Sequence, residues 1–300
     1  MITDELAEKI LDYAMTHGGD YAEIFEEEKE YSKISLTGKE ESSIQAGKEK
    51  GIGVRVLCRK ESCYMSTSNA NEHELFQKLK SCLQNRNRDE NLCNVKVIQP
   101  IQTFKSVGVK EWSTREKIQN LEKCIEIGKN SGPNITGILA SLLEDRQRVR
   151  IINTEGCNAK DERRKTRLFL KAFAEDGSDT AESYLGPGIM GGTEIFDQID
   201  VFELVEKTAA SAEKMLHAKP CPTGKMPVVV ANGFGGLLFH EACGHSLEAS
   251  NMAADGSEFS GKIGKQIASE KVSLIDDGAR PGAWGSLHID DEGIPTRKTY

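Results

Sequence analysis

The spacing of apolar residues changes along the chain between an extended and a helical period. Short apolar runs between Tyr21 and Ser68 are separated by turns rich in Gly, Lys and Glu, which is typical of about three or four antiparallel strands. Further strand-like runs are expected at residues 135–143, 149–153 and 166–174. Helical spacing occurs before, between and after these runs, near residues 6–14, 75–83, 118–125 and 201–216. This order of elements predicts an α+β fold whose N-terminal part is a strand-rich α/β domain.

Polar and glycine residues predict the ends of three helices. Ser113 and Glu116 have the spacing of a capping box, in which each side chain bonds to the backbone of the other residue. Asp200 with Glu203 begins the last long helix in a similar way. The first helix is expected to end at the Gly18-Gly19 pair, where a glycine can adopt the left-handed conformation.

A segment rich in proline and glycine divides the chain near residue 218. Residues 218–225 hold two prolines and a glycine, and the sequence on both sides is periodic, as expected for a boundary between domains. Single hydrophobic cores stop growing at about 250–300 residues, so a chain of 300 residues is expected to have two domains. We predict an N-terminal domain over residues 1–217 and a second domain over residues 218–300. The second begins with a strand-like run, Val228–Ala231, and a glycine-rich turn.

Charge and apolar patterning exclude several classes of partner. The chain has 39 Lys and Arg against 47 Asp and Glu, a net charge of −8, and no long basic block, so nucleic acid is not an expected partner. No apolar run approaches the roughly 20 residues that a membrane span needs. The chain begins with Asp4 and Glu5 among its first five residues and lacks the basic and apolar regions of a secretory signal, so we expect a cytoplasmic protein that does not enter the membrane.

The eight cysteines do not form a recognisable framework. They are scattered, and none occurs in a CxxC pair, so neither a disulfide scaffold nor a zinc ribbon is indicated. We expect reduced thiols.

Two of the six histidines occur in the sequence His240-Glu241-Ala242-Cys243-Gly244-His245, which is HExxxH. In the shorter motif HExxH, histidines four positions apart on a helix bind one zinc ion, and the glutamate acts on bound water. Five positions apart on an ideal α-helix, the two rings would diverge by about 140° with about 7.5 Å of rise. A π-bulge widens the turn by one residue, and Gly244 lowers the cost of a distorted backbone. We therefore predict a π-helical turn at this motif.

This arrangement predicts metal-assisted peptide hydrolysis. Neutral imidazoles supply two ligands, a third comes from elsewhere, and water in the fourth position has its pKa lowered to about 7. Glu241 would take the proton of that water and return it to the leaving nitrogen. Alternatively, both histidines are ordinary hydrogen-bonded residues and Glu241 is a solvated helix residue.

The motif and its surroundings resemble the TldD/PmbA family, on the TldD side, which keeps HExxxH. The matching segments are Gly235-Gly236 with the apolar run into HEACGHSLE, then Phe259–Gly264, Asp276–Gly278 and Ile289–Pro295. Weaker matches lie at Ile34–Leu36, Gly51–Val56 and Asn153–Gly156, so the resemblance covers essentially all 300 residues.

The resemblance implies that His240 and His245 are Zn²⁺ ligands and that Glu241 is the catalytic acid and base. It implies cleavage of short or unfolded peptides by a homodimer, or by a heterodimer with a PmbA-type subunit that lacks the motif. Residues 218–300 would be the beginning of a β-rich metallopeptidase domain.

One departure from the family concerns the third zinc ligand. Family members continue beyond the equivalent of Tyr300, and their third ligand is a cysteine from that later region, whereas this chain has no cysteine after Cys243. We expect that the chain is truncated or that the metal is held differently, with Cys243, Glu248 and His288 as candidate ligands. Glu248, three positions after His245, is alternatively expected to cap the helix or orient that histidine.

Two further functions stay open. The chain could be a catalytically incomplete subunit that binds peptide or partner without hydrolysis. The chain could also be a gyrase modulator that acts on a protein target, but only the name of the family supports this function, and no sequence feature does.

Several polar and aromatic residues near the C-terminal end are expected to be structural. His288 belongs to a strand-like run, and residues 290–292 form an acidic turn before Gly293. Trp112 and Trp284 are expected to be packing residues.

Overall fold

The computed structural model describes residues 2–38, 42–59, 61–84, 96, 101–105 and 109–300. They form two compact units. One comprises Met1–Ala218 with Asp277–Thr299, and we call it the sheet unit; the other comprises Lys219–Asp276 with Tyr300, and we call it the histidine unit. The structure thus groups residues 277–299 with the N-terminal part of the chain, while the division into domains 1–217 and 218–300 stays a prediction.

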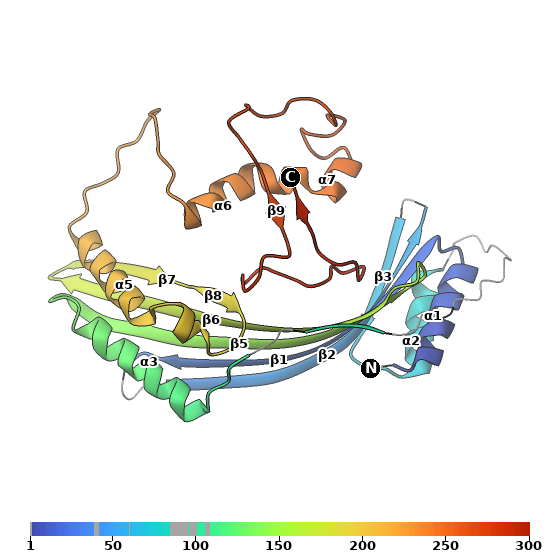
Figure 1. Cartoon of the computed structure of the whole chain (residues 1–300), viewed down its shortest axis with the longest axis horizontal. Coiled ribbons are helices and arrows are strands. Elements are labelled where there is room, and N and C mark those ends of the chain that lie inside the picture. The colour runs from blue at the N-terminus through green and yellow to red at the C-terminus, as the bar shows by residue number, and fades with distance from the viewer. Residues whose placement is uncertain (1, 39–41, 60, 85–95, 97–100, 106–108) are drawn as a thin grey trace. The chain divides into compact units, whose positions relative to one another are not determined.

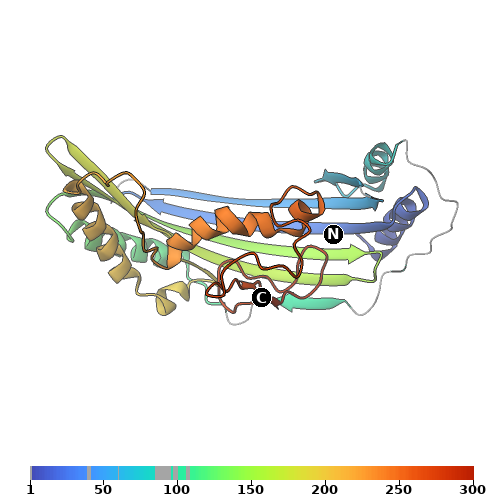
Figure 2. The ribbon, with the colours of Figure 1, turned by 90° about the horizontal axis from the view of Figure 1, so that it is seen from above.

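The sheet unit is built on one eight-stranded sheet in the order β3-β2-β1-β5-β6-β4, with β7 and β8 also pairing with β6 (Figures 1 and 2). Neighbouring strands are antiparallel except for β4, which runs parallel to β6. The α+β prediction is confirmed. The strands are β1 (Tyr21–Leu36), β2 (Ser42–Cys58), β3 (Glu61–Thr67), β4 (Gln102–Lys105), β5 (Ile135–Asn153), β6 (Asn158–Asp176), β7 (Asp179–Leu185) and β8 (Gly188–Met190), and β9 (Asp276–Asp277) and β10 (Lys298–Thr299) follow later in the chain.

In the described part of the chain five helices precede the histidine unit, and at the start of all but the shortest the side chain of the N-cap residue accepts a backbone hydrogen bond. Ser113 and Glu116 form the predicted capping box, and Asp200 accepts from the Glu203 N–H at 2.9 Å. Gly18, with φ +94°, follows the first helix as predicted. The helices are α1 (Asp4–Thr16), α2 (Glu72–Cys82), α3 (Thr114–Lys129), α4 (Ile195–Gln198) and α5 (Val201–Leu216).

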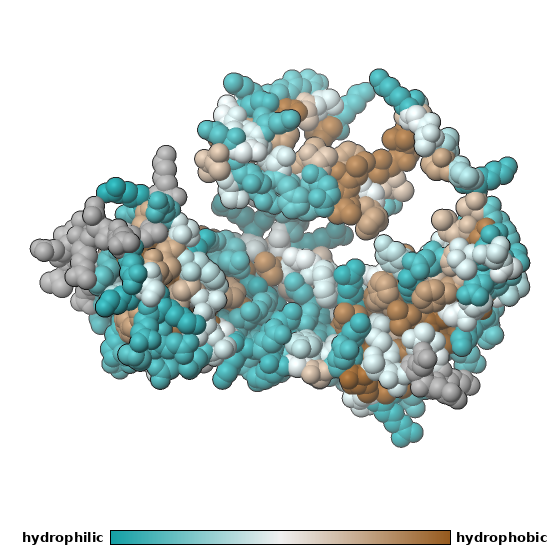
Figure 3. Space-filling model, turned by 180° about the vertical axis from the view of Figure 1, so that it is seen from behind, coloured by the Kyte–Doolittle hydropathy of each residue, from teal (hydrophilic) through white to brown (hydrophobic). Residues whose placement is uncertain are grey.

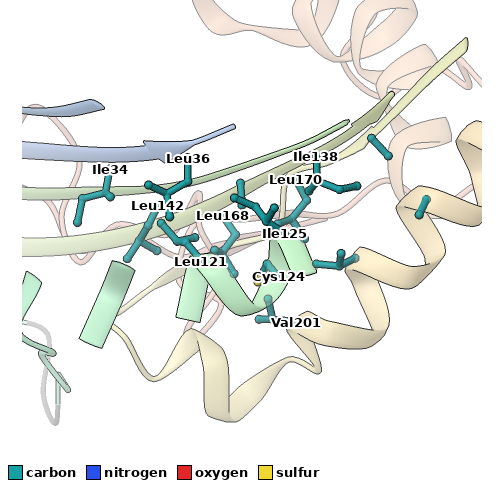
Figure 4. Packing of buried hydrophobic residues seen from close by; sticks show 14 of the residues in the cluster. Ile34, Leu36, Leu121, Cys124, Ile125, Ile138, Leu142, Leu168, Leu170 and Val201 are labelled. Atoms are coloured by element: carbon teal, nitrogen blue, oxygen red, sulfur yellow. The ribbon is translucent and has the colours of Figure 1, made fainter. Parts of the chain in front are cut away.

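Two hydrophobic cores lie on the same face of the sheet. Helices α3 and α5 pack on one end of that face, around residues such as Leu142 and Leu168 (Figure 4). Helices α1 and α2 pack on the other end, around Ile24 and Val54. Ile24 and Ile34 of β1 are an even number of residues apart, so their side chains point to the same face.

Residues 277–299 pack against the opposite face of the sheet, where Ile289 contacts a small cluster with Ile151 and Ala159. The buried carboxylate of Asp161 accepts hydrogen bonds from His288 Nδ1 and Arg163 Nε, each at 2.7 Å. The Arg163 guanidinium also donates to the Ile289 carbonyl at 2.9 Å. A buried ionic group therefore anchors this segment to β6.

The acidic stretch after Ile289 is the predicted turn. Asp290 Oδ1 accepts from the backbone N–H groups of Glu292 and Ile294. Gly293 has φ +81°, and a Cβ at that position would lie 2.2 Å from Cys157 Sγ, so this turn needs glycine both for its conformation and for space.

The structure corrects the expectation of reduced thiols at one pair. Cys63 in β3 and Cys82 at the end of α2 form a disulfide with Cα atoms 6.0 Å apart. Five described cysteines are free, namely Cys58, Cys124, Cys157, Cys221 and Cys243, while Cys93 lies outside the described residues. The scattered spacing did not indicate this pair, because the packing of α2 against β3 brings together residues 19 positions apart.

Reducing the Cys63–Cys82 disulfide is expected to lower the melting temperature by about 5–10 °C, because closing a loop of this size contributes roughly 3 kcal/mol. Calorimetry with and without dithiothreitol measures the shift. The matched variant Cys63→Ala should be insensitive to dithiothreitol. An unchanged melting temperature in the wild type, despite two additional titratable thiols, would contradict the prediction.

Candidate metal centre

The histidine unit contains a run of short helical turns. These are η1 (Gly233–Gly235), α6 (Gly236–Phe239), the π-helical turn η2 (His240–Gly244), η3 (His245–Leu247) and α7 (Ala249–Ala253) (Figure 1). The expected strand Val228–Ala231 does not form. No strand pairs with it in the described part of the chain, and Val229 is 100% exposed.

The predicted π-helical turn is confirmed, and it brings the two histidines together. The His245 N–H bonds to the His240 carbonyl, a step of five residues instead of four. The two imidazole rings lie 4.5 Å apart between centroids, with planes 66° apart. Ligand atoms of His240, Glu241 and His245 all lie within 4.8 Å of one another.

Gly244 contributes space rather than unusual backbone geometry. Its φ of −59° and ψ of −54° are ordinary helical values, so the expected relief of a distorted backbone is not needed. A Cβ at this position would lie 3.3 Å from Nδ1 of His240. The absence of a side chain therefore lets the His240 ring lie against the turn.

The two ring nitrogens of His245 have different surroundings. Nδ1 lies 2.7 Å from Glu248 Oε1, while Nε2 lies 3.8 Å from Glu241 Oε2. The hydrogen bond with Glu248, together with its negative charge, raises the pKa of His245, and Glu241 adds a smaller effect in the same direction. Of the two ring nitrogens of His245, Nε2 is therefore the one that lies near the Glu241 carboxylate, while Nδ1 lies near Glu248.

The donor set fits a divalent transition metal such as zinc. Two imidazoles and a carboxylate are common zinc ligands, and here their donor atoms already converge. All three side chains are exposed. A metal could therefore reach them from solvent.

None of the three candidates for a further ligand belongs to the converging group. Cys243 has a free thiol that does not belong to the converging group, and Glu248 is bonded to His245. His288 belongs to the sheet unit, where it is bonded to Asp161.

Sequence reasoning missed one residue of this centre, Asn251. Its Nδ2 donates to the His245 carbonyl at 2.8 Å and approaches Glu248 Oε2 at 3.5 Å. The only sequence feature that could have indicated Asn251 is its position three residues after Glu248, which places the two residues one helical turn apart.

Several large apolar side chains of the histidine unit are exposed, and Figure 3 shows brown residues at its surface. They include Phe234, Leu237, Leu238 and Phe239, next to the first histidine. Among the described helices, none has the length and apolar character needed to cross a membrane.

Comparison with known proteins gives two family matches. Residues 108–216 match the PmbA/TldA metallopeptidase central domain, and residues 223–300 match the C-terminal domain of the same family. A metalloprotease TldD homolog from Haemophilus influenzae is 32% identical over 207 residues, which are 67% of this chain and 43% of that protein. A metalloprotease from Methanocaldococcus jannaschii is 27% identical over 100% of this chain and 66% of its own length. The chain thus spans less than two thirds of either relative.

Solved structures share the fold. One from Bacteroides thetaiotaomicron, described as a proposed modulator of DNA gyrase, has a TM-score of 0.76 and 19% identity, covering 100% of this chain and 70% of that one. TldE from Thermococcus kodakarensis has a TM-score of 0.69 and 16% identity, covering 98% of this chain and 66% of that one. With its α+β sheet, its HExxxH turn and both domain matches, the chain belongs to the PmbA/TldD metallopeptidase family.

Proposed function

We propose that this chain carries the metal-binding helix of a zinc-dependent peptidase that hydrolyses short or unfolded peptides. The observation that carries the proposal is the convergence of His240, Glu241 and His245 on a π-helical turn. The family and the names of its relatives support a metallopeptidase. The peptide substrate and the identity of the metal as zinc are parts of the proposal.

In this proposal each residue of the group has one role. His240 and His245 hold the zinc ion, which supplies Lewis-acid activation of water and of the scissile carbonyl when bound. Glu241, whose side chain is 62% exposed, takes a proton from the attacking water and returns it to the leaving amide nitrogen. Its carboxylate can reach solvent, as a group that exchanges protons with water must.

We further propose that the working form is a homodimer, or a heterodimer with a PmbA-type subunit, in the cytoplasm. The family membership supports this assembly. Light scattering of the purified chain, alone and with a PmbA-type subunit, tests it.

The structure also supplies one observation that favours the alternative function, a subunit that binds peptide or partner without hydrolysis. Among the described residues, the converging group has two histidines and one carboxylate. If Glu241 is the base, two protein ligands are left, whereas catalytic zinc sites usually have three.

Zinc content decides between these functions. Elemental analysis of protein purified without chelator is expected to give about one zinc per chain, because the donor atoms of the group already converge. That zinc should be lost in His240→Ala, which removes one imidazole ligand. His73→Ala is the matched control, since His73 lies exposed on α2, where it bonds to Gln77. Absence of zinc from the wild type, with retained binding of an unfolded peptide, would contradict the enzyme and support the binding subunit.

A further inference from the structure

We infer that Glu248, held by Asn251, is a positioning residue that sets the tautomer of His245 and so presents Nε2 as its metal-binding nitrogen. The inference rests on the proposed function and deepens it, because it assigns a role to two residues outside the converging group. It is carried by the contacts around His245 Nδ1.

The first step is the hydrogen bond itself. Glu248 Oε1 lies 2.7 Å from His245 Nδ1, a normal hydrogen-bond distance. An ionised carboxylate can only accept, so the proton of this bond belongs to Nδ1. In a neutral imidazole with Nδ1 protonated, Nε2 carries the free lone pair. That nitrogen is the one 3.8 Å from Glu241, inside the converging group.

The second step excludes a capping role for Glu248. Glu248 occupies the N-cap position of α7, where acidic residues commonly accept from the backbone of the first turn. Here its side chain makes no capping hydrogen bond. The carboxylate is instead directed back to His245, so of the two roles expected from the sequence, orientation of the histidine is the one that the contacts support.

The third step concerns Asn251. Its amide donates to the His245 carbonyl at 2.8 Å, and the same nitrogen lies 3.5 Å from Glu248 Oε2. Asn251 therefore contacts both the backbone that carries the histidine and the second oxygen of the orienting carboxylate. A carboxylate that accepts from the second ring nitrogen of a metal-binding histidine is a typical outer contact of metal sites.

The tautomer can be measured without any metal. In the metal-free protein at alkaline pH, ¹⁵N NMR of the His245 ring is expected to show Nδ1 protonated in the wild type. In Glu248→Ala the proton should shift largely to Nε2, because its acceptor at Nδ1 is gone. Glu270→Ala is the matched control, since Glu270 is an exposed carboxylate of the same unit. Equal His245 ring shifts in the wild type and Glu248→Ala would overturn the inference.

Zinc affinity gives the functional readout. Competition for zinc with a chromophoric chelator is expected to show about 10–100-fold weaker binding in Glu248→Ala, the range seen when outer contacts of a metal site are removed. Glu248→Gln keeps an acceptor without the charge and should recover part of that loss, which a purely electrostatic role would not allow. Asn251→Ala should weaken binding less than Glu248→Ala, because the histidine bond itself is kept.

The two proposals fail in different ways. A wild type with Nδ1 protonated but without zinc would overturn the proposed function and leave in place only the part of the inference that Glu248 sets the tautomer of His245. A wild type that binds zinc with the same affinity as Glu248→Ala would overturn the positioning role and leave the proposed function in place.

Discussion

Replacing Glu241 by glutamine is expected to lower kcat/KM for hydrolysis of an unfolded peptide by about 10²–10⁴-fold, the usual contribution of a general acid and base. Glutamine has nearly the same shape as glutamate but cannot take a proton from water at neutral pH. The substitution therefore removes the proton transfer and leaves both imidazole ligands intact. Initial rates with a fluorogenic peptide measure the effect.

Zinc content measured on the same sample distinguishes two roles of Glu241. Its carboxylate lies within the converging group, so it could bind the metal directly instead of carrying a proton. Lost activity with retained zinc supports the proton carrier, while lost activity together with lost zinc supports a ligand. Glu270→Gln, a matched change in the same unit, should alter neither quantity. Activity within twofold of the wild type in Glu241→Gln would contradict both roles.

The local geometry of the metal centre could be predicted because it depends on residues that are close in sequence. Two histidines five positions apart cannot converge on an α-helix, so the hypothesis that both bind one metal ion predicted the π-helical turn that the structure contains. The same holds for the capping box at Ser113. The role of Gly244 could not be predicted, because it depends on where the His240 ring lies and not on backbone conformation.

The length of the strands was harder to predict. The sequence indicated separate strands at 135–143 and 149–153, whereas β5 runs through both, and β6 likewise begins well before residue 166. The intervening residues are mostly charged and interrupt the apolar alternation. They stay extended because they pair across strands, as Arg148 does with Glu28 at 3.4 Å and with Glu162 at 3.5 Å. A hydrophobic pattern does not detect such ion pairs.

Contacts between residues that are far apart in the chain could not be predicted from the sequence either. His288 was a candidate ligand and alternatively a structural histidine, and only the fold shows that Asp161, 127 residues earlier, is its partner. Nothing in the local sequence of either residue indicates the other.

That partner is the basis of the second large prediction, in which Asp161→Ala lowers the free energy of unfolding of the sheet unit by about 3–5 kcal/mol. The Asp161 side chain is 0% exposed and that of Arg163 is 4% exposed. Removing the carboxylate leaves a buried guanidinium without its charge partner and His288 Nδ1 without its hydrogen bond. The cost of an uncompensated buried charge is therefore the main source of the loss.

Urea denaturation followed by tryptophan fluorescence measures this loss selectively, since the chain has two tryptophans, Trp112 and Trp284, and both belong to the sheet unit. The control is Asp197→Ala, which removes an exposed ion pair with Lys110 and should cost at most about 1 kcal/mol. A loss equally small in Asp161→Ala would contradict the prediction.

The double variant Asp161→Ala/Arg163→Met separates the buried charge from the lost contacts. If the unpaired guanidinium causes most of the loss, replacing it by an apolar side chain should recover a large part of the stability, because a buried ion pair exchanged for apolar residues is often nearly neutral. No recovery would mean that the loss arises mainly from the contacts of Arg163 and His288 with residues 288–289. In that case the segment that follows the histidine unit would depend on these hydrogen bonds more than on the balance of charge beneath it.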